Sequence, residues 1–146
     1  MSKIRVTKQF DFEAAHALEN YSGKCRDIHG HSYHFRVTVI GEVRNDKSIE
    51  ENGMVIDFAI LKKVVKNNVV DVFDHTLVLR SDSRFRGIEA HNDRVMYVDY
   101  QPTCENMLLD MVNRIRNNLP HGISLHNAFL RETARSYAEW FATDNL

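Results

Sequence analysis

Apolar and polar residues alternate along two stretches near the N-terminus. In residues 4–16 the even positions are largely apolar and the odd positions largely polar, and His16 ends the apolar series. Residues 31–43, HSYHFRVTVIGEV, alternate in the same way, with His31 at the start of the apolar side and His34 on the polar side. A two-residue period is typical of a strand with one buried face. The chain is therefore predicted to begin with two strands, each carrying a histidine on its apolar face.

Two helices are predicted in the middle of the chain. Asp57 is a suitable N-cap for a helix over 58–73, where apolar residues recur at helical spacing. Pro102 and Thr103 open a second helix, which has an apolar face of its own and ends before Pro120.

The remaining segments are short. Residues 80–94 are polar and irregular, 95–100 read as a short strand, and 123–133 and 136–141 are strand-like. The order strand, strand, helix, helix, strand, strand predicts an α+β protein with one domain over 1–146.

Composition limits the classes of function. With 146 residues, of which 43% are hydrophobic, the chain can bury a core without a metal, so a metal here would serve chemistry. Lys and Arg number 19 against 20 Asp and Glu, without a basic stripe, which argues against nucleic acid and membrane surfaces as partners. No stretch is long enough to span a bilayer and no signal peptide is evident. We therefore expect a cytoplasmic protein whose two cysteines are free thiols.

The stretch CRDIHGHSYH, residues 25–34, contains the candidate chemistry. Residues two apart on an extended chain point the same way, so His29 and His31 would project together on the apolar face, beside His16. Three imidazoles with no thiolate or carboxylate are typical of a catalytic zinc site with an open fourth position. The alternative is three unrelated histidines, two of them in a turn. His34 is expected at the surface.

Cys25 and the Asp74-His75 pair each have two interpretations. Cys25 is either a small buried residue or, in a polar turn beside a cation, a thiolate that acts as nucleophile or base. Asp74 and His75 either cap the end of the first helix or form a carboxylate-oriented imidazole that relays protons to a thiol.

Two acids and the second cysteine complete the candidates. Glu105 lies in the first turn of the second predicted helix, where an acidic side chain interacts favourably with the positive end of the helix dipole. Glu132 ends the apolar run AFL, so its carboxylate either points to solvent or needs a pair of donors. Cys104 is expected to pack in the core.

Taken together and in order, these motifs resemble a known family, that of 6-pyruvoyl-tetrahydropterin synthase and 6-carboxy-tetrahydropterin synthase. The matching segments are FEAAH ending at His16, CRDIHGH at 25–31, GMVIDF at 53–58, DH at 74–75, PTCEN at 102–106 and the Glu132-Thr133 pair. The resemblance covers nearly the whole chain. It implies the tunnelling fold (T-fold), in which an antiparallel sheet in the order ββααββ carries two helices on one face. It also implies that three subunits close a barrel and two trimers form a homohexamer.

The resemblance also implies roles for the candidate residues. His16, His29 and His31 would bind zinc, and Cys25 would take protons from the side chain of 7,8-dihydroneopterin triphosphate. Asp74 and His75 would relay these protons, reaching Cys25 across a subunit boundary. Glu132 would anchor the pterin edge and could join the relay. Thr103 and Glu105 would line the same pocket.

The branch of the family depends on a small feature. Three residues separate Cys25 from the HGH motif, as in the bacterial enzymes of queuosine synthesis that release triphosphate and acetaldehyde and form 6-carboxy-5,6,7,8-tetrahydropterin. The animal biopterin enzymes, which form 6-pyruvoyl-tetrahydropterin, resemble a longer version. A protein that binds a pterin or purine without turnover is the third alternative. The polar segment 81–94 matches none of the motifs.

Overall fold

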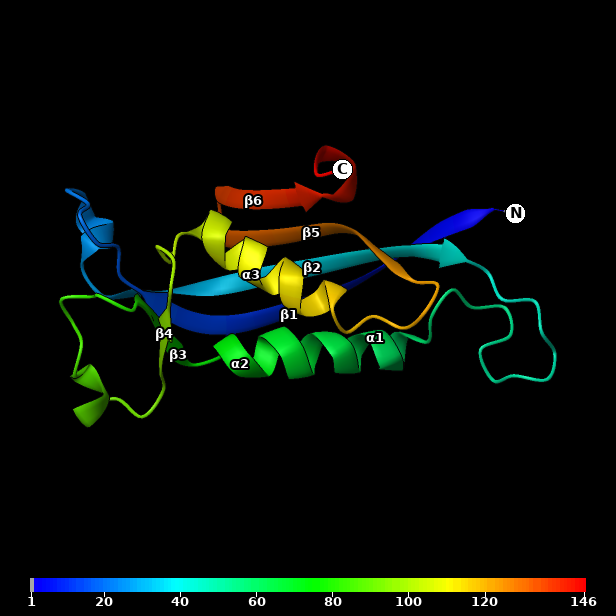
Figure 1. Ribbon diagram of the computed structural model, residues 1–146, viewed down its shortest axis with the longest axis horizontal. Helices are drawn as coiled ribbons and strands as arrows, with labels where there is room; N and C mark the ends of the chain where they lie inside the picture. Colours follow the sequence, from blue (N-terminus) through cyan, green and yellow to red (C-terminus); the bar gives the residue numbers. More distant parts are fainter. Residues whose placement is uncertain (1) are drawn as a thin grey trace.

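A long antiparallel hairpin, β1 (Lys3–His16) and β2 (His29–Glu42), forms the centre of the structure, a computed structural model that describes residues 2–146 (Figure 1). The hairpin pairs without interruption from Lys3 with Glu42 to His16 with His29. The two predicted strands are therefore confirmed. β2 begins two residues earlier than its alternation suggested, because His29 and Gly30 extend the ladder.

Six strands form one sheet in the order β4-β3-β1-β2-β5-β6. The pairs of β1 with β2, β2 with β5 (Ser124–Thr133) and β5 with β6 (Ser136–Phe141) are antiparallel, and both strand-like C-terminal segments are confirmed. The expected purely antiparallel sheet is corrected at one edge. There β3 (Thr76–Arg80) pairs parallel with β1, and β4 (Val95–Val98) pairs parallel with β3.

The parallel pairing follows from the path of the chain. β2 ends beside the start of β1, and the following helical segment carries the chain back to the other end of β1 before β3 begins. β3 continues in the direction of the helical segment, which is also the direction of β1, so it runs parallel to β1 and opposite to β2. β3 was missed in the sequence because TLVLR is short and apolar and shows no alternation.

Both predicted helices form where their caps place them. The first comprises α1 (Phe58–Val65), a π-helical stretch (Lys66–Val70) and α2 (Asp71–Phe73), and the Asp57 carboxylate accepts the backbone N–H of Ala59 at 2.8 Å. The second is α3 (Cys104–Arg116), where the Thr103 hydroxyl accepts the N–H of Asn106 at 3.2 Å. Within residues 2–146 no helix is long and apolar enough to cross a membrane.

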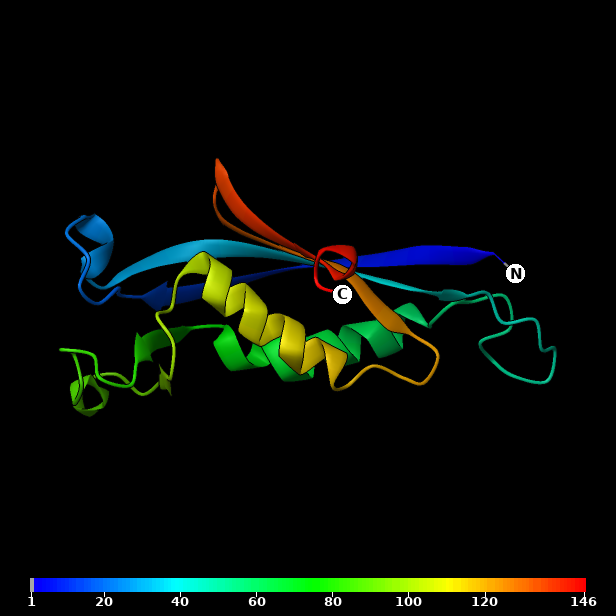
Figure 2. The same ribbon diagram turned by 45° about the horizontal axis from the view of Figure 1, so that its top comes forward.

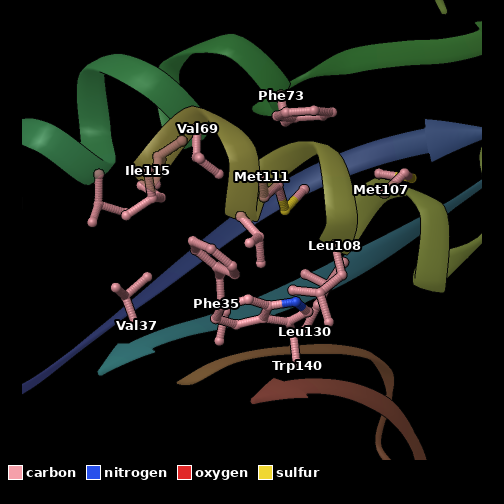
Figure 3. Packing of buried hydrophobic residues seen from close by; sticks show 14 of the residues in the cluster. Phe35, Val37, Val69, Phe73, Met107, Leu108, Met111, Ile115, Leu130 and Trp140 are labelled. Carbon is pink, nitrogen blue, oxygen red and sulfur yellow. The ribbon is translucent and has the colours of Figure 1, made fainter. Parts of the chain in front are cut away.

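The helices cover one face of the sheet, and the apolar core lies between the helices and the sheet (Figure 2). Phe35 and Leu130 of the sheet pack in one cluster with Met107 and Met111 of α3 and Phe73 of α2 (Figure 3). Each of these side chains is fully buried, and burial of one such group stabilises the fold by about 1.5–3 kcal/mol. The sheet and both helical segments therefore share one apolar core.

The opposite face of the β1-β2 hairpin is largely polar. Thr7 and Thr38 share a hydrogen bond of 2.7 Å across the hairpin. His34 contacts the Asp11 carboxylate at 2.7 Å and the Gln9 amide oxygen at 2.8 Å, so its predicted place on the polar face is confirmed. The two faces of the hairpin therefore differ as the alternation predicted.

Two irregular segments lie at the same end of the molecule, where β1 ends (Figure 1). The loop 17–28 connects β1 to β2 and contains a 3-10 turn, Lys24–Arg26. The polar segment 81–94 connects β3 to β4 and contains another, Ile88–Ala90. The candidate site residues of the hairpin lie at this end.

Candidate functional site

Three histidines converge where the central hairpin opens into its loop. His16 is the last residue of β1 and pairs with His29, the first residue of β2. His31 pairs with Ala14, two positions further along the hairpin. All three side chains lie on the helix-covered face, and one ligand nitrogen from each lies within 4.8 Å of the others. The convergence that strand alternation predicted is therefore present in the structure.

The Nε2 atoms of these histidines lack partners. In the described part of the chain, Nε2 of His16, His29 and His31 are the buried side-chain nitrogen or oxygen atoms without a hydrogen bond. Nδ1 of His16 donates to the carbonyl of Pro102 at 2.6 Å, and Nδ1 of His29 donates to that of Asp27 at 2.7 Å. A carbonyl oxygen only accepts, so Nδ1 carries the proton and Nε2 presents a lone pair.

Burial favours the neutral form of two of the imidazoles, those of His16 and His31. The pKa of His16 is lowered chiefly by burial, although the Pro102 carbonyl and the Glu132 carboxylate oppose this. Burial likewise lowers the pKa of His31, again against Glu132. Unpaired and convergent imidazole nitrogens are a donor set that suits zinc, so these residues fit the metal that the resemblance implies. They leave at least one coordination position open.

Glu132 lies beside the cluster. Its Oε1 is 3.4 Å from Nε2 of His16 and 3.8 Å from Nε2 of His31, without forming a hydrogen bond to either. Tyr33 donates its hydroxyl to the same oxygen at 3.4 Å. Of the two orientations considered from sequence, Glu132 therefore points inward. It places a negative charge next to the open side of the histidines.

Tyr33 is a residue of the site that the sequence reasoning passed over. It is buried, stacks on Phe12 with 5.3 Å between ring centroids, and meets the ring of His31 edge-on at 5.6 Å. Burial and then the Glu132 charge raise its pKa, so the phenol stays a donor to Glu132. Its shared alternation with His31 was the signal that could have identified it.

The two cysteines occupy different environments. Cys25 lies half-buried in the 3-10 turn of loop 17–28, and its carbonyl accepts the N–H of Leu18 at 3.0 Å. Cys104 is buried, with its thiol 3.4 Å from the carbonyl oxygen of Leu130, and its expected packing in the core is confirmed. Burial and then the charges of Glu132 and Glu105 raise the pKa of Cys104 to about 12. Cys25 is thus the more accessible thiol.

Asp74 and His75 form a pair at the end of the first helical segment. The Asp74 carboxylate accepts the N–H of Glu13 at 2.9 Å and lies 3.0 Å from Nδ1 of His75. Burial acts to raise the pKa of Asp74, but the hydrogen bonds from Glu13 and His75 lower it overall. His75 has a left-handed backbone, with φ of 56°, and a side chain that is 73% exposed. The pair is therefore both a helix end and a carboxylate-oriented imidazole.

His75 lines a pocket that also reaches the histidine cluster. His75 and His31 both line a pocket of about 370 Å³, together with Glu13 and Asn92. Cys25 is absent from the lining of this pocket in the described residues, 2–146. The structure thus groups His75 with His31 of the histidine cluster in one pocket.

Thr103 and Glu105 lie at the start of α3. The Thr103 hydroxyl caps the helix, and the preceding residue, Pro102, supplies the carbonyl that orients His16. Glu105 is an exposed residue of the first turn, as expected for an acid near the positive end of the helix dipole. Glu132 lies close to Nε2 of His16 and of His31. The Thr103 side chain contacts the helix itself, and the Glu105 side chain is exposed to solvent.

A central hairpin, two helical segments on one face of the sheet and three histidines at the mouth of the hairpin together define a T-fold protein with a candidate metal centre. The chain belongs to the 6-pyruvoyl tetrahydropterin synthase family, whose family model matches residues 5–142. The resemblance drawn from the sequence motifs is therefore confirmed.

Curated relatives carry the name 6-carboxy-5,6,7,8-tetrahydropterin synthase. One from Synechocystis is 44% identical over 137 residues, covering 94% of this chain and 92% of the relative. One from Haemophilus influenzae is 29% identical over 142 residues, covering 94% of this chain and 98% of the relative. The similarity therefore extends over almost the full length of these proteins.

Solved structures confirm the fold. An uncharacterised protein from Wolinella succinogenes superposes with a TM-score of 0.80 at 20% identity, covering 97% of this chain and 99% of that one. The Caenorhabditis elegans 6-pyruvoyl tetrahydropterin synthase superposes with a TM-score of 0.69 at 26% identity, covering 97% of each chain. The expected T-fold, of α+β class, is correct.

Proposed function

We propose that this protein is a zinc-dependent 6-carboxy-5,6,7,8-tetrahydropterin synthase that acts on 7,8-dihydroneopterin triphosphate. It releases triphosphate and acetaldehyde, a step of queuosine synthesis in the cytoplasm. The observation that carries the proposal is the set of three convergent, unpaired Nε2 atoms with the Glu132 carboxylate beside them. The names of the curated relatives support the carboxy-forming reaction.

His16, His29 and His31 hold the metal in this proposal. When bound, zinc supplies a Lewis acid that polarises the oxygens of the substrate side chain and eases removal of its carbon-bound protons. The protein holds two of the imidazoles in place through the carbonyls of Pro102 and Asp27. Such partners of the ligands tune metal affinity as well as geometry.

Cys25 is the base that removes the protons, and Asp74 with His75 relays them. The separation of this pair from Cys25 in one chain supports an active site shared between subunits. The strong exposure of the His75 side chain makes it available to a neighbour. The protein is then a homohexamer of two trimers, as the family resemblance implies.

Glu132 anchors the pterin. A carboxylate can accept two parallel hydrogen bonds from the guanidine-like edge of a pterin, a geometry that gives both affinity and orientation. The Tyr33 hydroxyl donates to one oxygen of Glu132 and leaves the other oxygen free of this contact. Thr103 and Glu105 line the same substrate pocket in this proposal, as the family resemblance implies.

The decisive experiment is product analysis. Zinc-loaded protein is given dihydroneopterin triphosphate, triphosphate is measured, and acetaldehyde is counted with a coupled alcohol dehydrogenase. Acetaldehyde that appears in step with triphosphate is the expected result. Triphosphate with a pyruvoyl product by mass would place the protein in the biopterin branch. Release of neither would indicate a pterin-binding protein without turnover.

A further inference from the structure

A nearly buried carboxylate connects loop 17–28 to the polar segment 81–94. Glu19 is 9% exposed, although it lies in a loop. Its Oε1 accepts the hydroxyl of Ser83 at 2.9 Å, and its Oε2 lies 3.7 Å from Nη1 of Arg84. Because a buried carboxylate is costly unless it is paired, these contacts hold the two segments together.

The other arm of Arg84 reaches the far end of the same loop. Its Nη2 donates to the carbonyl of Arg26, the residue after Cys25, and lies 3.4 Å from Oδ1 of Asp27. A guanidinium is a planar fork of five donors, which suits it to join several acceptors at fixed positions. Arg84 therefore contacts the loop on both sides of Cys25.

The loop is also tied to the histidine cluster. The Gln101 side chain pairs with the backbone of Glu19, accepting its N–H at 2.9 Å and donating to its carbonyl at 2.6 Å. The next residue, Pro102, orients His16, and the carbonyl of Asp27 orients His29. The contacts of Arg84 thus fix Cys25 in relation to two of the candidate metal ligands.

We propose that Arg84 is a positioning residue: by clamping both ends of loop 17–28 it holds Cys25 in place against the histidine cluster. The inference rests on the proposed function for the roles of Cys25 and the histidines. It assigns a role to segment 81–94, which the sequence motifs left unexplained. A base displaced by about 1 Å can lose about a hundredfold in rate, so such a clamp matters without touching the substrate.

Substitution of Arg84 by Ala, with Arg86→Ala as matched control, tests this role. Arg86 lies in the same segment with the same charge, but it contacts the Ser81 carbonyl and the Tyr97 ring. Alkylation of Cys25 by iodoacetamide, followed by peptide mass spectrometry, reports on the loop without requiring activity. Cys104, buried and with a raised pKa, serves as the slow internal reference.

We expect Arg84→Ala to alkylate several-fold faster at Cys25 than wild type and Arg86→Ala, because the half-buried thiol becomes more accessible. Turnover should show kcat lowered by about tenfold or more with KM little changed, since the pterin anchor lies elsewhere. Arg84→Lys keeps the charge but lacks the fork, so it should recover part of the loss. Melting temperature and zinc content should match those of Arg86→Ala.

Two outcomes would overturn the role of Arg84. One is an alkylation rate and kcat equal to those of Arg86→Ala. The other is a fall in melting temperature that accounts for the loss of activity, which would mean a purely structural contact. An inactive wild type would count against the proposed function instead, and the alkylation comparison would still decide the role of Arg84.

Discussion

The histidine cluster and the Asp74-His75 pair differ in how complete they are within one chain. The cluster sits on the buried face of the central hairpin, with its ligand atoms close together and two rings oriented by backbone carbonyls. The pair lies at a helix end, with His75 mostly exposed and Cys25 outside the pocket that it lines. One subunit thus brings the three candidate metal ligands together, whereas the proposed proton relay would be completed by a second subunit.

The largest effect is expected from loss of a candidate metal ligand. His29→Ala removes one of three donors, so zinc should fall from about one per chain to near zero, and activity should fall below detection. Because the core does not depend on the metal, the far-UV circular dichroism should be unchanged. Zinc is measured by mass spectrometry after dialysis.

His34→Ala, on the opposite face with Asp11 and Gln9, is the control and should retain zinc. Full zinc occupancy in His29→Ala would contradict the site.

Mixed oligomers test the division between subunits. Cys25→Ala and His75→Ala should each lower kcat by about 10²–10⁴ while retaining zinc, since each removes a proton-transfer group. If the relay reaches Cys25 from a neighbour, chains of the two variants that are unfolded together and refolded should regain about a quarter of wild-type activity. Separate refolding followed by mixing is the control. No recovery in co-refolded material would place the whole relay in one chain.

Loss of the pterin anchor should have a smaller effect. Glu132→Gln keeps the shape and the Tyr33 contact but removes the charge, and each charged hydrogen bond lost costs roughly 1.5–3 kcal/mol. Dihydroneopterin binding, followed by fluorescence titration, should weaken by about one to two orders of magnitude. Glu105→Gln, an exposed acid outside the histidine cluster, is the comparison and should change affinity less. Equal affinity of Glu132→Gln and wild type would show that Glu132 does not bind the pterin.

The smallest effect concerns the contribution of Asp74, at the C-terminal end of α2, to the free energy of unfolding. The pKa of Asp74 in the folded chain is below its ordinary value, so the unfolded chain binds more protons in the acid range. The contribution of Asp74 is therefore present above the unfolded pKa of about 3.8 and is lost as the pH falls through the folded pKa. The urea midpoints of wild type and Asp74→Asn should differ slightly at pH 7 and converge as the pH falls through the folded pKa of Asp74. Asp144→Asn, near the exposed C-terminus, is the control and should show no such convergence. A difference between wild type and Asp74→Asn that does not change with pH would contradict the link between the protonation of Asp74 and stability.

The elements of the fold were largely determined by local sequence. Strand alternation and helix caps are decided by residues a few positions apart, so the hairpin and the N-caps Asp57 and Thr103 could be predicted. The same alternation placed His29 and His31 on one face with His16. The short strand β3 escaped because its apolar run shows no period.

Tertiary structure decided what surrounds these residues. The carbonyl that orients His16 comes from Pro102, 86 positions away, and the carboxylate next to it comes from Glu132 on another strand. No local pattern encodes such contacts, because they depend on how α3 and β5 pack against the hairpin. The place of His75 in one pocket with His31 likewise depends on the pairing of β3 with β1. Sequence thus determined which groups the site has, and packing determined which of them meet in one chain.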